Sequence, residues 1–433
     1  MTDSTSGLDI DGGGAESMAA TDFALDAPVT DLAGAARAAI GRIRGGELGS
    51  LPALLAIAVL ATVFGAANPE SFLSAINLAN FLEQASSVIV IAMAVSFALL
   101  LGEIDLAAGF TAGVSAAVLA TRLQEWPLIP SVAMAALVAI ALGLFTGFMV
   151  ARVGIPSFVV TLANVLLFQG ILLLLVREGG SVRIEEPVVK DLVGANLTVA
   201  LSWAFVAIGV LAYALLLMRQ RRAADRPTPW SVLIVKVGAL GLGAVLVTAI
   251  LTANRAFPNA PEPIRGLPIV IPAVLVLVVL LNVLLNRTRF GRHLYAVGGN
   301  PEAARRAGID VTRIRLAAFT LCGLLAGIGG AFLASRVNSV DPNTGANDTL
   351  LLAVGAAVIG GTSLFGGRGR MMNAVLGGFV LALIPNGLTL VGTRDIPLLG
   401  TVEFGSSGVK FICAGAALLL ASSVDALSRR RTP

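Results

Sequence analysis

Charged residues, histidine and cysteine are all scarce in this chain, and each scarcity excludes a class of function. Only 13% of the 433 residues are charged, whereas a soluble domain carries about 25%. His293 is the single histidine, which excludes a metal site built from several histidines. Cys322 and Cys413 lie inside apolar runs, where a small buried residue is expected rather than a disulfide or a redox site.

The phosphate-binding pattern G-x-x-x-x-G-K-[ST] is also absent, so any ATP must bind a partner chain. No set of nucleophile, base and acid is recognisable, and we expect no catalytic residue, metal or cofactor on this chain. A membrane-bound enzyme is therefore disfavoured.

Long apolar runs, in contrast, recur along most of the sequence, and 56% of the residues are hydrophobic. Runs of about 20 residues match the length that a helix needs to cross a ~30 Å hydrocarbon core. A transmembrane barrel would show short alternating segments instead. We predict an all-α, polytopic membrane protein with about twelve spans: 51–67, 80–101, 107–121, 130–150, 157–176, 198–217, 231–252, 268–285, 316–335, 348–362, 371–391 and 406–424.

The distribution of charge predicts the topology. Residues 1–50 begin with acidic, Gly- and Ser-rich sequence, which indicates a disordered cytoplasmic tail. Residues 51–427 would form the membrane domain, and 428–433 a basic cytoplasmic tail. With both ends inside, 20 Lys and Arg residues fall on the cytoplasmic side and 8 outside, as the positive-inside rule requires. This placement accounts for the net charge of +4 without a nucleic-acid partner.

Two glycine-bounded breaks interrupt the apolar runs: GEIDLAAG at 102–109 and GGTSLFGG at 360–367. They align on their first and last glycines and on Leu106 with Leu364, a weak internal repeat of a kind common in transporters. A carboxylate at membrane depth costs at least ~2.5–3.5 kcal/mol. The acids could face a pathway or bind N–H groups of the next helix. The candidates are Gly102, Glu103, Asp105, Gly109, Gly360, Gly361, Thr362, Ser363, Gly366 and Gly367.

The longest basic segment assigned to the cytoplasm is 286–315. Asn300 is a predicted N-cap, Pro301 suits the first helical position, and Gly308 is a predicted stop. A short surface helix flanked by arginines is what a docking element for a soluble partner requires. The alternative is a loop that only satisfies the positive-inside rule.

Several motifs here resemble the permeases of ATP-driven importers. Glu302-Ala303-Ala304, followed after three residues by Gly308, resembles the EAA-x3-G core of their coupling loop. Together with the two breaks, the segments GRHLYAVGGNPEAARRAGI (291–309), NGLTLVG (386–392) and LLLASSVDALSRRR (418–431) resemble the ribose/xylose permease family, especially its xylose-type branch. The resemblance covers about residues 70–431.

This resemblance implies a multi-pass permease of the bacterial inner membrane. It implies a homodimer bound to an ATPase subunit that carries two nucleotide-binding domains, ATP and Mg, and an extracytoplasmic sugar-binding protein. It assigns the ATPase-coupling loop to residues Arg292, Glu302, Ala303, Ala304 and Gly308. The first break departs from the family pattern Ile-Asp-Leu-Ser-Val-Gly at Ala107 and Ala108, and Leu350-Leu351-Leu352 replaces Glu-Leu-Asp before the second break.

Sugar identity is left open by these departures. Polar residues within spans could line the sugar path, although such residues more often hydrogen-bond between helices. They are Asn80, Gln84, Asn164, Gln169, Asn386 and Lys410. Two alternatives are also open: an ATP-independent secondary transporter or channel that uses Glu103, Asp105 and Lys410, and an importer permease for nucleosides or branched-chain amino acids.

Overall fold

The computed structural model describes residues 34, 37, 49–223, 228–256, 262–396 and 400–429. The two predicted tails, 1–50 and 428–433, therefore fall largely outside the described residues. The chain forms two compact units. The smaller comprises Met1–Glu47, Ala204–Leu246 and Ser428–Pro433, and the larger comprises Leu48–Trp203 and Val247–Leu427.

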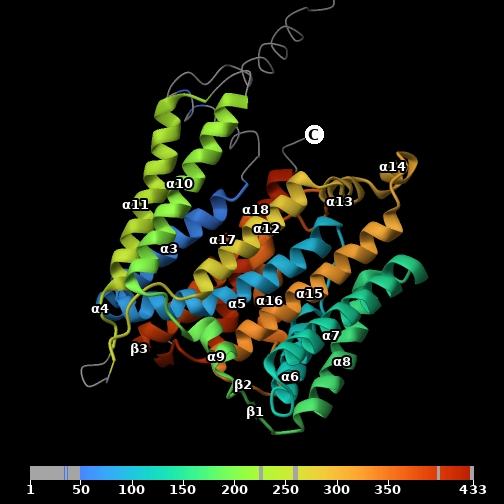
Figure 1. The fold of residues 1–433 in the computed structure, drawn as a ribbon, viewed down its shortest axis with the longest axis horizontal. Helices are drawn as coiled ribbons and strands as arrows, with labels where there is room; N and C mark the ends of the chain where they lie inside the picture. The colour runs from blue at the N-terminus through green and yellow to red at the C-terminus, as the bar shows by residue number, and fades with distance from the viewer. Residues whose placement is uncertain are drawn as a thin grey trace, which may run out of the picture. The chain divides into compact units, whose positions relative to one another are not determined.

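Most of the described residues are in helices (Figure 1). Those in the first half of the chain are α3 (Leu51–Ala67), α4 (Pro69–Phe72), α5 (Ala75–Leu100), α6 (Ala108–Arg122), α7 (Leu128–Phe148) with a π-helical continuation η1 (Met149–Val153), α8 (Ser157–Val176), α9 (Pro187–Gly194) and α10 (Val199–Ala223). Those in the second half are α11 (Trp230–Thr252), α12 (Val270–Arg287), α13 (Arg289–Gly299), α14 (Pro301–Arg306), α15 (Val311–Val337), α16 (Asn347–Ile359), α17 (Met371–Val391) and α18 (Ser407–Arg429).

Each of the twelve predicted apolar segments contains a helix. Within the described residues, eight helices are long and apolar enough to span a membrane: α5, α7 with η1, α8, α10, α11, α12, α15 and α17. Shorter apolar helices are α3 and the parts Thr349–Ile359 of α16 and Ser407–Leu420 of α18. The prediction of a helical, polytopic membrane protein is confirmed at this coarser level.

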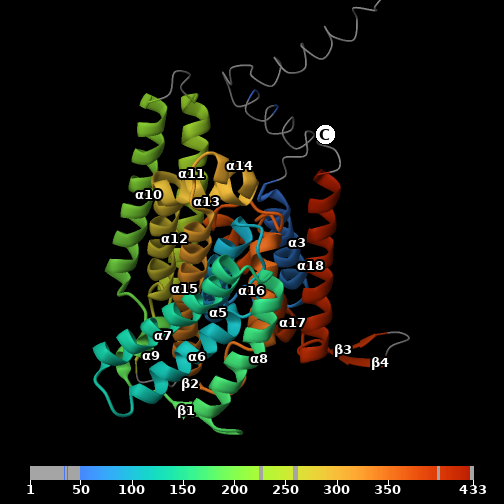
Figure 2. The same ribbon diagram turned by 90° about the vertical axis from the view of Figure 1, so that its right-hand side faces the viewer.

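The core of the larger unit is built around α5, which contacts α15, α16 and α17 (Figure 2). Its most apolar 18-residue window is 83% buried, against 56% for α15 and α17. Ile91, Met93 and Phe97 have no exposed surface. Because the surrounding helices hold α5 in place, the end of α5 fixes where the first break begins.

Small residues allow the helices to approach closely. α7 packs on α15 where Gly143 meets the backbone of Phe319 and Gly323. α17 packs on α5 where Gly378 meets Ile89, and on α16 where Gly377 meets Ala356. These glycines of the apolar runs are therefore packing positions.

The connections after α8, α11 and α15 are tied by short strands and a buried arginine. β1 (Val182–Arg183) pairs antiparallel with β2 (Ser339–Val340).

Arg255 donates to the carbonyl oxygens of Gly266 (2.9 Å) and Leu251 and to Oδ1 of Asn196 (2.7 Å). Burial lowers the pKa of Arg255, and the nearby Glu83 partly offsets this. A hairpin of β3 (Thr393–Ile396) with β4 (Gly400–Glu403) joins α17 to α18.

The described part of the smaller unit consists mainly of α10 and α11, whose apolar side chains are mostly exposed. The guanidinium carbon of Arg221 lies 3.9 Å from the ring centroid of Trp230, a cation–π contact between the end of α10 and the start of α11. Exposed apolar helices of this kind are expected where the surroundings are hydrocarbon rather than water.

We predict that Gly143→Ala destabilises the protein, whereas Gly170→Ala does not. A Cβ on Gly143 would lie 2.5 Å from the Phe319 carbonyl oxygen and 2.9 Å from Gly323 Cα, while Gly170 in α8 has open space. Overpacking at such a contact costs about 1–3 kcal/mol. Thermal unfolding of the two variants in detergent measures the difference, and equal midpoints would contradict this account of the packing.

Candidate functional site

The predicted coupling segment 286–315 contains α13 and α14, and one face of α13 packs against the rest of the larger unit. Its buried residues follow a spacing of three to four, and Leu294 and Val297 have no exposed surface. Thr288 caps the helix by accepting from the Gly291 N–H (3.2 Å). Arg292 is on the exposed side. α13 is therefore a surface helix with one face packed in the core and the other exposed.

The short helix α14 is closed at both ends as the sequence predicted. Oδ1 of Asn300 accepts from the N–H groups of Glu302 and Ala303, each at 3.0 Å, and Pro301 occupies the first position. At the other end, Gly308 adopts φ +83° and the Ile309 N–H donates to the Ala304 carbonyl at 3.0 Å. This is a Schellman motif, which needs a glycine in the left-handed region.

Most residues of the proposed coupling loop are accessible. Glu302, Ala303 and Gly308 are exposed, and Ala304 is buried. Glu302 pairs with Arg305 (3.1 Å) and Arg306 (3.6 Å), but these exposed pairs contribute little stability. The charged side chains of α14 are therefore accessible to a soluble partner.

The first break begins where α5 ends. Gly102 adopts φ +75°, and the next residue, Glu103, forms an ion pair with Arg315 at the start of α15 (3.0 Å). The Ile104 N–H donates to Ser157 Oγ (3.3 Å), and its carbonyl accepts from Thr161 Oγ1 (3.2 Å). Side chains of α8 thus satisfy backbone groups that helix geometry no longer pairs.

Asp105 is buried beside the N-terminus of α6. Its Oδ1 accepts from the Ala107 N–H (2.8 Å), and its Oδ2 accepts from the Cys322 thiol (3.2 Å). The sequence left two interpretations of this acid: it faces a pathway, or it binds N–H groups of the next helix. The observed contact of Asp105 corresponds to the second. Glu103 instead has the arginine partner described above.

The second break follows α16 and is folded on itself. The Thr362 N–H donates to the Ala357 carbonyl, and the Ser363 N–H donates to the Arg368 carbonyl, each at 2.9 Å. Ser363 Oγ accepts from the Phe365 N–H at 3.0 Å. Thr362 Oγ1 is buried and has no hydrogen-bond partner among the described residues.

The two breaks and the end of α13 meet backbone to backbone. The Gly367 N–H donates to the Leu100 carbonyl at 2.9 Å. A Cβ on Gly298 would overlap the Leu100 carbonyl oxygen and lie 2.8 Å from Gly367 N. A Cβ on Gly366 would lie 2.5 Å from the Gly298 carbonyl oxygen and 2.8 Å from Gly102 N. We call this contact the glycine junction; it comprises Leu100, Gly102, Gly298, Phe365, Gly366 and Gly367.

One side-chain hydrogen bond adds to this contact. The Tyr295 hydroxyl of α13 donates to the Gly369 carbonyl, just after the second break, at 2.7 Å. Burial raises the pKa of Tyr295, although the charge of Arg370 opposes this. The hydroxyl therefore keeps the proton that it donates. Sequence reasoning missed Tyr295, Gly298 and Arg315 as site residues, because their partners are remote in the sequence.

The remaining predicted break residues lie outside the glycine junction. Gly109 packs against the backbone of Gly345 and Cβ of Leu350, and Gly360 packs against the backbone of Asn373. Gly361 adopts φ +103°. Gly109 allows close packing of α6 on α16, and Gly360 allows close packing of α16 on α17.

The six polar candidates for a sugar path are spread over α5, α8, α17 and α18, and no described hydrogen bond joins any two of them. Asn164 donates to Thr146 of α7 (2.9 Å), and Asn386 donates to Asn77 of α5 (2.9 Å). These two residues connect helices. Asn80 is exposed, and Gln84, Gln169 and Lys410 are half-buried.

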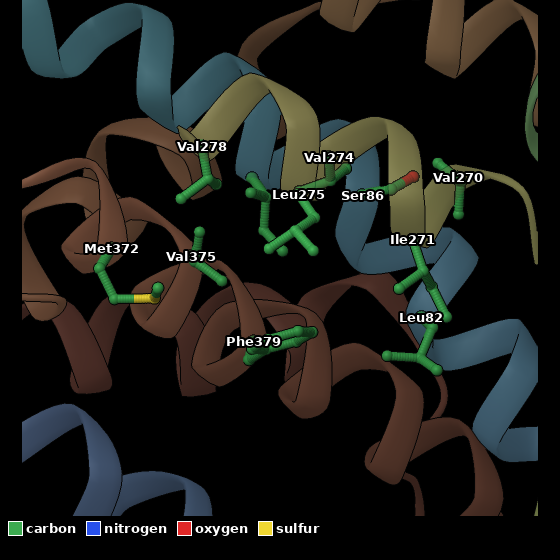
Figure 3. Close-up of a pocket in the computed structure, with 11 residues that line it drawn as sticks. Leu82, Ser86, Val270, Ile271, Val274, Leu275, Val278, Met372, Val375 and Phe379 are labelled. Atoms are coloured by element: carbon green, nitrogen blue, oxygen red, sulfur yellow. The ribbon is translucent and has the colours of Figure 1, made fainter. Parts of the chain in front are cut away.

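A cavity of about 170 Å³ lies between α5, α12 and α17 (Figure 3). Its lining is apolar except for Ser86, whose hydroxyl already donates to the Glu83 carbonyl at 2.6 Å. Phe379 and Val375 of α17 face Leu275 and Val274 of α12 across it. A sugar that entered this cavity would lose its hydrogen bonds to water and find almost no polar partners in the protein. The cavity is therefore unsuited to bind a sugar.

We predict that Gly298→Ala disrupts the glycine junction and that the adjacent Gly299→Ala does not. The new Cβ at 298 would meet fixed backbone, whereas nothing lies within 4 Å at 299. A loss of about 1–3 kcal/mol is expected at 298 from overpacking. Thermal unfolding and hydrogen exchange of residues 360–370 provide the measurements; similar behaviour of the two variants would contradict the assignment.

Comparison with known proteins supports one family. Residues 77–421 match the family model described as "Branched-chain amino acid transport system / permease component". The xylose transport system permease protein of Escherichia coli (strain K12) is 32% identical over 384 residues, covering 88% of this chain and 92% of that protein. The ribose import permease protein of the same strain is 28% identical over 373 residues, covering 86% and 92%.

The D-allose transport system permease protein of E. coli K12 is 27% identical over 337 residues, covering 77% of this chain and 82% of that protein. No solved structure matches. The chain therefore belongs to the family of transport-system permease components that includes the xylose, ribose and allose permeases.

Proposed function

We propose that this chain is the membrane-spanning permease subunit of an ATP-driven importer of xylose or a related monosaccharide, in the bacterial inner membrane. The relatives named for xylose, ribose and allose transport support the substrate class. The observation that carries the mechanism is the exposed, doubly capped α14 beside the glycine junction. It supplies a rigid surface that a soluble ATPase can displace.

The proposed topology has twelve crossings with both ends in the cytoplasm, as the excess of basic residues on that side favours. α6 and α16 would be partial crossings, because they have only 15 and 13 residues and each adjoins a break. The paired breaks then lie on the cytoplasmic side, next to α13.

ATP and Mg would bind the partner, because the chain lacks a phosphate-binding loop. The ATPase, with two nucleotide-binding domains, would dock on Arg292, Glu302, Ala303 and Gly308, with Ala304 holding α14 on the larger unit. A homodimer of this chain and an extracytoplasmic sugar-binding protein complete the proposed complex.

An ATP-independent transporter would need ionisable groups that are free to exchange ions. Glu103 is paired with Arg315, and Asp105 accepts from a helix N–H and from a thiol. These contacts favour structural roles for both acids. We therefore rank ion-coupled transport below the ATP-driven importer.

We predict that this chain alone, reconstituted in proteoliposomes under an ion gradient, gives no xylose uptake. Uptake should appear only when the ATPase, ATP and the binding protein encoded beside this chain are supplied, because energy enters through the partner. Radiolabelled D-xylose measures the difference. Robust uptake by the chain alone would establish the secondary-transporter alternative instead.

We further predict that Glu302→Lys combined with Gly308→Pro abolishes association with the ATPase while the permease still inserts in the membrane. Proline fixes φ near −65°, whereas Gly308 requires +83°. Glu302→Lys reverses an exposed charge with little effect on stability. Co-purification of the ATPase is the measurement.

The matched control is Glu125→Lys, which removes the surface pair of Glu125 with Arg122, outside the segment 286–315. This variant should retain the ATPase at the wild-type level. Unchanged co-purification in the double variant, or equal loss in the control, would argue against docking on α14.

A further inference from the structure

Two polar side-chain contacts connect the segment 286–315 to the breaks, one to each. Tyr295 binds the Gly369 carbonyl beside the second break (2.7 Å), and Arg315 pairs with Glu103 in the first (3.0 Å). The other described side-chain hydrogen bonds of this segment stay within it or reach back into the last turn of α12. The coupling segment is therefore attached to both breaks at two separate points.

The two contacts flank the glycine junction. Tyr295 is one helical turn before Gly298 on α13, and Glu103 directly follows Gly102. The backbone contacts of the glycine junction are short but include few hydrogen bonds. They prevent α13 from moving closer to the breaks, but they do little to prevent α13 from sliding along them. A directional hydrogen bond on one side and an ion pair on the other resist sliding.

Both contacts are partly shielded from solvent, which strengthens them. The side chains of Glu103 and Arg315 are 15% and 28% exposed, whereas those of the Glu302–Arg305 pair on α14 are 59% and 65% exposed. Reduced exposure weakens screening by solvent and salt. Tyr295 is half-buried, and its hydroxyl donates to the Gly369 carbonyl.

We propose that Tyr295 and the Arg315–Glu103 pair are positioning residues that make the coupling segment move as one body with both breaks. This inference rests on the proposed function. Displacement of α14 by the ATPase would then shift the ends of α5 and α16 together. Without these contacts, α13 slides over the glycine junction, and hydrolysis proceeds with less transport.

The first test measures D-xylose transported per ATP hydrolysed by the complete complex in proteoliposomes. Tyr295→Phe removes only the hydroxyl, and the expected ratio falls about fivefold, the effect of one neutral hydrogen bond. Tyr213→Phe, at the other tyrosine of the chain, lies on α10 and is the matched control. ATPase co-purification should be unchanged in both. A wild-type ratio in Tyr295→Phe would overturn the assignment of Tyr295.

The ion pair is tested by charge exchange. Glu103→Arg and Arg315→Glu should each lower the transport ratio, and the double exchange should restore it in part. Partial rescue by the double exchange would show that the two residues act through their contact with each other. A double variant no better than the two single variants would overturn the role of this pair.

A third measurement uses the permease alone in lipid nanodiscs and is independent of transport. Hydrogen exchange of residues 360–370 should be faster in Tyr295→Phe than in the wild type or in Tyr213→Phe, because the second break is less restrained. Equal exchange would show that Tyr295 does not hold the break. If none of the sugars xylose, ribose and allose stimulates hydrolysis by the wild-type complex, the proposed function fails, and the exchange result still decides the contact.

Discussion

The structure depends on one constraint: backbone that leaves helical geometry inside an apolar body must find its hydrogen bonds within the protein. At the first break, Ser157 and Thr161 of α8 take up the N–H and carbonyl of Ile104. At the second, the Gly367 N–H binds the Leu100 carbonyl. The second contact requires two backbones to meet directly, which the glycines at 298, 366 and 367 allow. Satisfying the constraint therefore brings the two breaks to the same place, where Gly298 of α13 also fits.

Helices, caps and breaks were predictable because their signals are local. Asn300, Pro301 and Gly308 specify the ends of α14 through neighbouring backbone groups, and the apolar runs specify helices by length. The alignment of the two breaks indicated related elements. That they touch each other and α13 was not predictable, since nothing near Gly298 in the sequence specifies Leu100 or Gly367 as a neighbour.

The polar residues show the same limit. Asp105 had two reasonable interpretations, and only the fold places it against the Ala107 N–H and Cys322. Asn164 and Asn386 stood out as polar groups in apolar runs, yet their partners lie on other helices. Tyr295 carried no signal, because a tyrosine on an amphipathic helix is ordinary until Gly369 is placed beside it. Roles set by tertiary contact require the fold.

The double capping of α14 has a consequence for the kinetics of assembly. Asn300 and the turn at Gly308 keep this six-residue helix folded without help from a partner. Isolated helices of that length are unstable in water, and a segment that folded only on contact would lose conformational entropy at that moment. Because the shape already exists, docking of the ATPase on α14 as proposed would need little rearrangement, and the bound state could be left and re-entered quickly during repeated cycles.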